Sequence, residues 1–426
     1  MSGVNRPELL SPAGSMESLK AAVNGGCDAV YLGGKQFSAR QYAGNFDLKE
    51  LEDACDYCHL RGVKVYVTVN TVYKDEELAG FLTYIRSLYE MGVDALIMQD
   101  TGAERLVKAH FPDFPLHAST QMTCNSLADV KYWESRGFDK IVLSRELSLE
   151  EIKHITENTE AEIETFVHGA LCVCYSGQCI MSSMLGGRSG NRGRCAQTCR
   201  LPYTLYKGYD SMAEGYLLSP KDVMTVEILP QLIEAGIASL KIEGRMKSPE
   251  YVAGVTRIYR KYIDLYFENS EEYKVDPADI KALQQLFNRG GFTEGYYTSF
   301  AGREMMSIER PKSWGLKVGI VDKYLPKYKK VTIRTREPLV PGDGLEIWTQ
   351  TEPHVGTNVS KHSKAGEVIT ITLEGDINKN DVVYRTFGKA LQDELKKTYE
   401  KDTRKLPIYG MLRVKEGESD FLTALG

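Results

Sequence analysis

Cysteines crowd into one short stretch in the middle of this chain. Between residues 172 and 199 lie five of the nine cysteines: Cys172, Cys174, Cys179, Cys195 and Cys199. Thiols kept reduced and brought together in this way serve a soft metal, an iron–sulfur cluster or redox chemistry. Cys172 with Cys179 and Cys195 with Cys199 make two pairs, and four thiolates suit either a tetrahedral zinc ion or a cubane cluster.

The spacing within the first pair favours the cluster. Structural zinc sites take their cysteines from knuckles with about two to four intervening residues, whereas six residues separate Cys172 from Cys179. Cys174 is then the spare thiol, because it lies too close to Cys172 to be needed. The plain alternative is that these cysteines are small buried hydrophobes, but the glycine-rich and serine-rich filling of the stretch is unsuited to a core strand.

Arginines interleave with the cysteines. Arg188, Arg192, Arg194 and Arg200 add positive charge to the same stretch. Cations and N–H groups near cluster sulfurs raise the reduction potential, and the same arginines could meet a phosphate backbone. The alternative is a solvated loop whose charges only keep it soluble. We interpret the run as a binding patch, because the glycines between the arginines allow close backbone approach.

The flanking sequence supplies the scaffold for these residues. Short β-branched runs alternate with amphipathic helical stretches, and seven such runs precede the cysteines: LLSPA, DAVYLGG, VKVYVTVN, DALIMQD, LHASTQ, KIVLSRE and EIETFVHGA. An eighth, SLKIEGR, follows a helix expected over Lys221–Ala235. Eight units predict an α/β fold, a (β/α)8 TIM-like barrel over residues 1–268, with a doubly wound sheet as the alternative. The cysteine-bearing insertion occupies 169–218 and includes a hairpin within Tyr203–Leu218.

Polar residues at the ends of these runs form the candidate site. In (β/α)8 barrels, chemistry gathers where strands end and βα loops begin. The predicted catalytic residues are Glu243, Arg245, His117 and His168. The predicted substrate-binding residues are Arg40, Asn70, Gln121, Arg145 and Lys241. Each has a structural alternative, such as an amide that satisfies loop backbone or a hydrogen-bonded interior histidine.

The arginines of this set indicate an anionic substrate. Arginine keeps its charge and binds carboxylates through a bidentate fork. A dicarboxylate, a phosphate or an acidic peptide would each satisfy such a site.

After the barrel the pattern changes. Residues 269–312 are predicted to be a helical linker, and 313–388 show the period of two that is typical of a small β-barrel domain. Lys327, Lys329, Lys330, Arg334 and Arg336 give that domain a basic face suited to docking RNA, with a structural clamp as the alternative. Residues 389–426 read as a helix and the start of a further domain, so we expect a longer protein.

Composition narrows the class of protein. The chain has 426 residues with 42% hydrophobic and 26% charged residues, which is typical of a globular protein. A net charge of −5 argues against indiscriminate coating of nucleic acid, though not against a local basic face. The amino-terminal residues lack the apolar core of a signal peptide, and no apolar run reaches the length of a membrane span. We therefore expect a cytoplasmic protein.

The cysteine region resembles a known family. Residues Glu164, Phe166, Gly169, Ala170, Leu171, Cys172, Gly177, Cys179, Met181 and Ser182 follow the signature order of the collagenase-like peptidases of unknown catalytic type, family thirty-two. The likeness continues through ELLSPAG, NRGRCAQTCRLPY, LLSPKD and KIEGRMKSPEYV. Several members are RNA hydroxylation proteins, which make 5-hydroxyuridine at the tRNA wobble position or hydroxylate a cytidine of large-subunit rRNA.

The resemblance carries expectations for cofactor and substrate. It implies a barrel with an iron–sulfur cluster, [4Fe-4S], held by Cys172, Cys179, Cys195 and Cys199. It also implies prephenate, a dicarboxylate, as co-substrate in the tRNA branch. Some relatives place a ligand cysteine shortly after the SPKD motif, where this chain has Met224. A thioether is a poor cluster ligand, so Met224 is expected to pack in the core.

Two other interpretations stay open. In the first the protein is a peptidase, with Cys172 or Cys174 and His168 as a thiol–imidazole pair. The sequence contains neither HExxH nor GxSxG. In the second it is a non-catalytic scaffold that carries a cluster for a partner enzyme. The sequence gives no indication of the oligomeric state.

Overall fold

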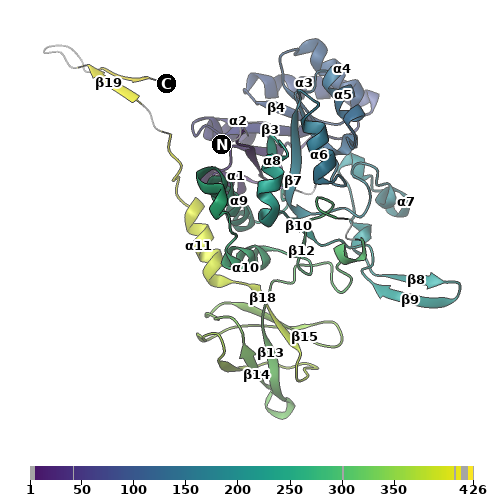
Figure 1. Cartoon of the computed structure of the whole chain (residues 1–426), viewed down its shortest axis with the longest axis vertical. Coiled ribbons are helices and arrows are strands. Elements are labelled where there is room, and N and C mark those ends of the chain that lie inside the picture. Colours follow the sequence, from purple (N-terminus) through teal and green to yellow (C-terminus); the bar gives the residue numbers. More distant parts are fainter. Residues whose placement is uncertain (1–4, 42, 300–301, 407–408, 414–420, 426) are drawn as a thin grey trace.

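The computed structural model describes residues 5–41, 43–299, 302–406, 409–413 and 421–425. A helix-wrapped barrel occupies the upper part of Figure 1, a second domain of β-strands lies below it, and a hairpin projects to one side. The chain ends in a small strand pair on the opposite side of the barrel from the hairpin (Figure 1). No helix within these described ranges is long and apolar enough to cross a membrane.

Eight parallel strands close the barrel. They are β1 (Glu8–Pro12), β2 (Ala29–Gly33), β3 (Lys64–Val69), β4 (Ala95–Met98), β5 (Leu116–Ala118), β6 (Lys140–Val142), β7 (Glu162–Ala170) and β11 (Ser239–Ile242). Neighbours in the chain pair in order, and β11 pairs with both β7 and β1. This closure confirms the predicted (β/α)8 barrel and excludes the doubly wound sheet. Because the strands are parallel, their carboxyl ends meet at one mouth.

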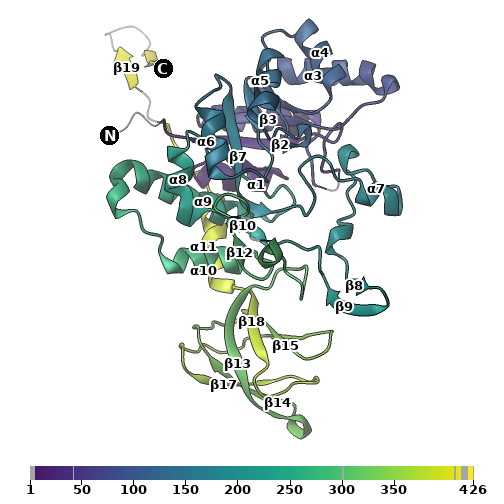
Figure 2. The same ribbon diagram turned by 45° about the vertical axis from the view of Figure 1, so that its right-hand side comes forward.

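Helices cover the outside of the barrel (Figure 2). They are α1 (Met16–Asn24), α2 (Leu48–His59), α3 (Leu78–Glu90), α4 (Thr101–His110), α5 (Leu127–Ser135), α6 (Leu149–Thr156), α8 (Leu229–Glu234) and α9 (Pro249–Asn269). Their starts are set by local chemistry: Ser15 caps α1, and Asp47 and Ser148 form capping boxes with Glu50 and Glu151. Their apolar faces pack on the outer side of the strands in one continuous core.

The helix predicted over Lys221–Ala235 is wrong in its first half. Strand β10 (Asp222–Met224) runs antiparallel to β7, and α8 begins only at Leu229. Val223 is β-branched and Asp222 is buried in an ion pair with Arg289, and both features favour extended backbone held in place by tertiary contacts. Met224 lies in the core, as expected. The two-residue strand β12 (Phe292–Thr293) adds to the outer edge of β10.

The second domain is a six-stranded antiparallel sheet. Its strands are β13 (Leu316–Leu325), β14 (Lys330–Thr335), β15 (Gly344–Trp348), β16 (Val355–Asn358), β17 (Val368–Thr372) and β18 (Val382–Phe387), in the order β16-β15-β18-β13-β14-β17. The sheet curls as a half-barrel around a core of its own. This confirms the predicted all-β domain. Two residues of its expected basic face are neutralised, since Lys329 pairs with Glu374 and Arg334 with Asp322.

Three helices and a terminal strand pair complete the fold. The tyrosine-rich helix α9 buries Tyr251, Tyr259 and Tyr262 against the barrel. Helix α10 (Pro277–Leu286) leads to the second domain, and α11 (Lys389–Tyr399) returns from it to pack on α9 and α1. Strands β19 (Tyr409–Arg413) and β20 (Phe421–Leu425) then pair with each other.

Candidate functional site

The cysteine loop lies over the mouth of the barrel. It leaves the end of β7 and contains the short helix α7 (Met181–Gly186). Three hydrogen bonds connect it to the loops after β2, β3 and β5. Gln41 N donates to Gly193 O at 3.3 Å and Val72 N donates to Asn191 O at 3.2 Å. Thr123 Oγ1 donates to Ser176 O at 2.9 Å. Gly193 has φ +75° and lies so close to Ser38 that a Cβ would come within 2.6 Å of its carbonyl oxygen. The loop therefore roofs the carboxyl ends of the strands.

The four candidate ligand cysteines all lie on this roof. Cys172 and Cys195 are exposed, and Cys179 and Cys199 are half-buried. Burial raises the pKa of the Cys199 thiol, Arg200 lowers it, and negative charge on Cys172, Cys195 and Cys179 raises it further. The thiols are thus electrostatic neighbours. Even so, no three His, Cys, Asp or Glu side chains in the described parts of the chain stand close enough to hold a single metal ion.

The chemistry of this donor set is compatible with an iron–sulfur cluster. A tetrahedral zinc ion requires its sulfurs within about 2.3 Å of one centre, whereas a cubane of four irons binds its thiolates at four separate corners and spaces them more widely. The backbone N–H of Gln197 also donates to Cys195 Sγ at 3.4 Å, a contact of the kind that tunes cluster sulfurs. The donor set of four accessible thiols fits an iron–sulfur group.

The cysteines outside the loop behave differently. Cys27, Cys55, Cys58 and Cys124 are buried in the barrel's outer core. Burial raises the pKa of the Cys55 and Cys124 thiols to about 12. These are the small hydrophobes of the plain interpretation, and that interpretation does not extend to the exposed thiols of the loop.

Glu243 is the hub of charge at the mouth. Its Oε2 lies 2.9 Å from Arg145 Nη2 and 3.6 Å from Arg40 Nη2. Burial alone would raise the pKa of this carboxyl, but the positive charges of Arg40, Arg145, Arg245 and Lys241 outweigh it and lower the pKa to about 2. Glu243 is therefore a carboxylate at neutral pH and suits positioning of cations better than donation of a proton.

The low pKa of Glu243 predicts how stability depends on pH. The ordinary carboxyl pKa of 4.5 applies when the chain is unfolded, so the folded state binds fewer protons between pH 4.5 and 2. The carboxylate therefore contributes about 3 kcal/mol above pH 4.5, and this is lost as the pH falls toward 2. We expect Glu243→Gln to lower the free energy of unfolding at pH 7 and to flatten its decline in acid, measured by urea denaturation.

A second carboxyl at the mouth, that of Glu146, provides a control in which stability changes with pH in the opposite direction. Burial raises the pKa of Glu146, so its ionisation costs stability as the pH rises above its unfolded value. Glu146→Gln should therefore raise stability at pH 7 relative to pH 4. Equal pH slopes for wild type and Glu243→Gln would contradict the assignment of Glu243.

Arg145 and Arg245 are held firmly, whereas Arg40 is accessible. Arg145 donates to Ala170 O at 2.7 Å and stacks on the Phe166 ring. Arg245 is buried and donates to Ser38 Oγ and Thr68 Oγ1, both neutral hydroxyls. The side chain of Arg40 is 40% exposed. Arg40 is therefore the cation at the mouth best able to meet a ligand.

Buried polar atoms without a protein partner line the same mouth. They are Gln99 Oε1 after β4, Gln121 Oε1 after β5, and Arg145 Nε and Glu146 Oε2 after β6. Strands β4, β5 and β6 are neighbours in the barrel. Buried polar groups are normally hydrogen-bonded, because an unsatisfied one costs about 1–3 kcal/mol. The cluster indicates a place where a polar ligand or water completes the bonding.

Asn70 has partners within the protein. Its Oδ1 accepts from Ala39 N at 3.1 Å and its Nδ2 donates to Ser119 Oγ at 3.4 Å. It links the loops after β2, β3 and β5, and this placement matches the structural alternative of an amide that satisfies loop backbone.

Lys241 and His117 lie deeper, inside the barrel. Lys241 Nζ is 2.7 Å from Glu164 Oε1, and both side chains are almost fully buried. The His117 ring meets Tyr66 edge-on at 4.6 Å between centroids, and burial holds its pKa well below the ordinary value. A second buried pair, Lys140 with Glu8, completes the interior. Lys241 and His117 therefore lie within strands β11 and β5, whereas Glu243 follows the end of β11.

His168 lies outside the barrel wall. Its ring is surrounded by Tyr251, Tyr259 and Phe292, and its Nδ1 is 3.4 Å from Tyr259 Oη. Burial, aided by the charge of Lys247, lowers the pKa of His168 to about 3. No hydrogen bond joins it to a cysteine in the described ranges.

Sequence reasoning missed Lys247. It follows β11 at the same mouth, its ammonium lies over the Phe287 ring, and burial lowers its pKa to about 7, with the charges of Asp222 and Arg289 acting in opposite directions. Its position four residues after Glu243, in the motif KIEGRMK, was the only signal in the sequence.

Two of the four loop arginines hold the roof in place. Arg192 makes a two-pronged ion pair with Glu77, at 2.7 and 2.8 Å, and Arg200 donates to Ser219 Oγ and Leu171 O. Arg194 is exposed. The binding patch predicted from the sequence is therefore smaller than four residues.

Comparison with known proteins places the chain in a family. The model of peptidase family U32 matches residues 14–307. The tRNA hydroxylation protein P1 of Bacillus subtilis is 36% identical over 80% of this chain and 83% of its own length. The 23S rRNA 5-hydroxycytidine synthase of Escherichia coli is 40% identical over 85% of this chain, which spans 55% of that protein. A collagenase of Porphyromonas gingivalis is 36% identical over 69% of this chain and 74% of its own length. The chain belongs to peptidase family U32.

Proposed function

We propose that this protein is an RNA-modifying enzyme that hydroxylates a pyrimidine in tRNA or rRNA. In this proposal an iron–sulfur cluster is bound by Cys172, Cys179, Cys195 and Cys199, and a prephenate-like dicarboxylate occupies the barrel mouth. Both named hydroxylation relatives support the RNA reaction. The cellular setting that goes with it is the cytoplasm, where tRNA and ribosomes are found.

The observation that carries the proposal is the charge at the mouth beneath the thiol roof. Three arginines, Arg40, Arg145 and Arg245, surround one carboxylate, Glu243. Lys241 adds no net charge, because it is paired with Glu164. The three arginines exceed Glu243 by two positive charges, and a dianion matches that excess. The unpartnered Gln99 and Gln121 oxygens beside them suit a ligand that also carries hydroxyl donors.

Hydroxylation requires redox chemistry. Replacement of a C–H bond of the base by C–OH is a two-electron oxidation that also adds an oxygen atom, so the reaction consumes an external two-electron oxidant and an oxygen donor besides the RNA. A bound iron–sulfur cluster would supply electron transfer at this mouth. The chain's own contribution is to hold the dianion through Arg40 and Arg145, to keep Glu243 ionised, and to cover the mouth with the loop.

The peptidase interpretation has less support. It needs a histidine that can accept a proton from a cysteine thiol. His168 is buried among aromatic rings, its pKa is about 3, and its ring nitrogen Nδ1 contacts the hydroxyl of Tyr259. The scaffold interpretation leaves the uncompensated charge of the mouth without a purpose.

The test is a comparison of modified nucleosides in total RNA. RNA from cells with and without the gene is digested and analysed by mass spectrometry, separately for tRNA and rRNA. We expect a hydroxylated uridine or cytidine to disappear on deletion and to return with the wild-type gene. Unchanged hydroxylated pyrimidines would overturn the proposal. Cleavage of gelatin by the purified protein after iron removal would support the peptidase instead.

A further inference from the structure

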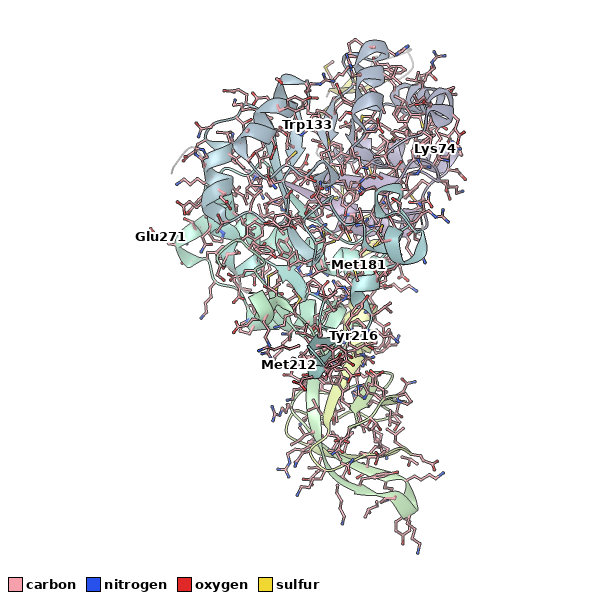
Figure 3. The ribbon with its side chains drawn as sticks, turned by 90° about the vertical axis from the view of Figure 1, so that its right-hand side faces the viewer. Lys74, Trp133, Met181, Met212, Tyr216 and Glu271 are labelled. Carbon is pink, nitrogen blue, oxygen red and sulfur yellow. The ribbon has the colours of Figure 1, made fainter. Side chains whose placement is uncertain are left out.

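The hairpin of the insertion projects from the body of the protein. Strands β8 (Tyr203–Lys207) and β9 (Asp210–Gly215) pair only with each other in the described ranges. Figures 1 and 2 show the hairpin extending sideways, clear of both the barrel helices and the second domain. Figure 3 looks onto that side, with Met181 of α7 and Met212 of β9 labelled. An isolated two-stranded hairpin is marginal in water, so a partner that covers it would stabilise it.

Aromatic side chains are displayed on the hairpin and beside it. Tyr206 is 60% exposed, Tyr209 at the turn is fully exposed, and Tyr175 in the cysteine loop is 60% exposed. Tyrosine normally buries its ring when it has only a structural role. Tyr251, Tyr259 and Tyr262 of α9 are buried in this way, whereas Tyr132 and Tyr328 are exposed singly on other elements.

Charge distinguishes this segment from the rest of the chain. Residues 172–216 contain five basic and two acidic residues, whereas the whole chain has a net charge of −5; Arg192 is paired with Glu77, and the hairpin itself carries Lys207 with Asp210 and Glu214. Arg194 and Lys207 are both exposed there. The excess of positive charge therefore lies in the cysteine loop at the base of the hairpin, and a cationic patch on an acidic protein suits a polyanion better than a second copy of this chain.

The hairpin is fixed to the cysteine loop at its base. Tyr203 Oη donates to Thr198 O at 2.9 Å, next to Cys199, and Tyr216 N donates to Ile308 O at 2.8 Å. Arg200 further ties the loop to Ser219, just beyond the hairpin. A ligand lying along the hairpin is therefore directed toward the thiol roof and the barrel mouth.

We propose that the β8–β9 hairpin, with Tyr175 beside it, is a docking arm for single-stranded RNA. This inference rests on the proposed function. It specifies that the RNA is bound in single-stranded form and that the hairpin binds it. Unstacked bases stack on tyrosine rings, and the phosphates between them meet Arg194 and Lys207. Single-stranded RNA fits because its bases are unstacked, while paired bases in an A-form helix keep their faces covered.

The basic face of the second domain is the competing RNA surface. Two of its five basic residues, Lys329 and Arg334, are already paired with acidic residues, and it displays one exposed ring, Tyr328. That surface also lies on a separate sheet, in the domain below the barrel (Figure 1). The hairpin combines displayed rings with a direct connection to the site.

The experiment measures RNA binding by the full-length protein with its iron retained. A fluorescein-labelled oligouridine and a duplex RNA of equal length are titrated at fixed salt, and fluorescence anisotropy gives Kd. The double variant Tyr206→Ala with Tyr209→Ala is expected to bind the oligouridine roughly tenfold or more weakly. Arg194→Ala should weaken binding and reduce its salt dependence. The duplex should bind wild type more weakly than the oligouridine.

Matched variants separate stacking from apolar contact. Phenylalanine at both positions keeps the rings and should bind like wild type. Leucine at both positions keeps apolar area without a ring and should bind as weakly as alanine. Unchanged melting temperature and iron content exclude a folding defect.

Three outcomes would contradict the proposal that the hairpin is a docking arm for RNA. The alanine pair could bind the oligouridine as tightly as wild type, or the leucine pair could do so. The alanine pair could instead change the oligomeric mass by light scattering while RNA binding stays the same, which would identify a protein–protein surface. None of these touches the proposed function, because the deletion experiment on modified nucleosides reports on that separately.

Discussion

Serine in place of Cys172, Cys179, Cys195 or Cys199 is expected to abolish both iron retention and RNA hydroxylation. An anaerobically purified wild-type chain should carry about four irons and four sulfides. Serine has nearly the size of cysteine but binds iron–sulfur clusters poorly, so each variant should lose most of its iron and its visible absorption. Iron and sulfide analysis, together with modified nucleosides in complemented cells, measures the two losses. All four thiols are accessible on one loop, so no core packing is disturbed.

Cys174→Ser is the matched control for these variants. Cys174 is half-buried in the same loop, and its thiol neighbours Cys179 and Cys172, whose charges add to burial in raising its pKa. As the spare thiol it should tolerate serine with iron content unchanged. Loss of iron from Cys174→Ser together with its retention in Cys199→Ser would assign the fourth ligand to Cys174. Iron at wild-type level in all five variants would remove the cluster from these residues altogether.

Arg40→Ala is expected to weaken binding of the dicarboxylate roughly tenfold to a hundredfold. A charge-assisted hydrogen bond contributes about 1.5–3 kcal/mol, and each 1.4 kcal/mol is a factor of ten in affinity. Arg40 is the most accessible of the mouth arginines and is 3.6 Å from Glu243. Its loss also reduces the excess of positive charge that the three arginines have over Glu243. Isothermal titration of the purified protein with prephenate gives the affinity directly.

Two variants sharpen the Arg40 measurement. Arg40→Lys keeps the charge but not the planar fork, so an intermediate affinity is expected. Arg257→Ala is the control, because the Arg257 side chain is 43% exposed on α9 and pairs only loosely with Glu394 at 3.6 Å. It should bind prephenate like wild type. Equal affinity for Arg40→Ala and Arg257→Ala would show that the ligand does not meet the mouth through Arg40.

Lys241 and Glu243 show the limit of reasoning from the sequence. They are two residues apart at the end of one strand, and alternation predicts that both project to the same side of it, so both are predicted as site residues, Glu243 as catalytic and Lys241 as substrate-binding. In the fold, Lys241 reaches Glu164 on β7 and is neutralised inside the barrel, whereas Glu243 reaches Arg145 beyond the end of β6. Depth within a barrel depends on the stagger between strands, which local sequence does not specify.

His168 shows a second limit. Alternation along β7 from Glu164 and Phe166 would point it into the barrel. The pairing of β7 with β11 shifts register between Lys241 and Ile242, which leaves Val167 as the extra residue and turns His168 outward toward α9. A β-bulge redirects every side chain beyond it. Nothing in the periodicity of EIETFVHGA indicates where the partner strand inserts that irregularity.

The sequence alone determined what depends on local pattern: eight βα units, the strand-rich second domain, and a loop with two cysteine pairs between the seventh and eighth strands. The period of the hydrophobic residues and the spacing of the cysteines are sufficient to predict these features. Both depend only on residues that are near one another in the chain. Only the tertiary structure decided which polar groups meet. It assigned Arg192 and Arg200 to holding the loop, left Arg40 accessible, and brought Lys247 to the mouth. Such partnerships join residues far apart in the chain, and they depend on strand register and loop placement that no single segment encodes.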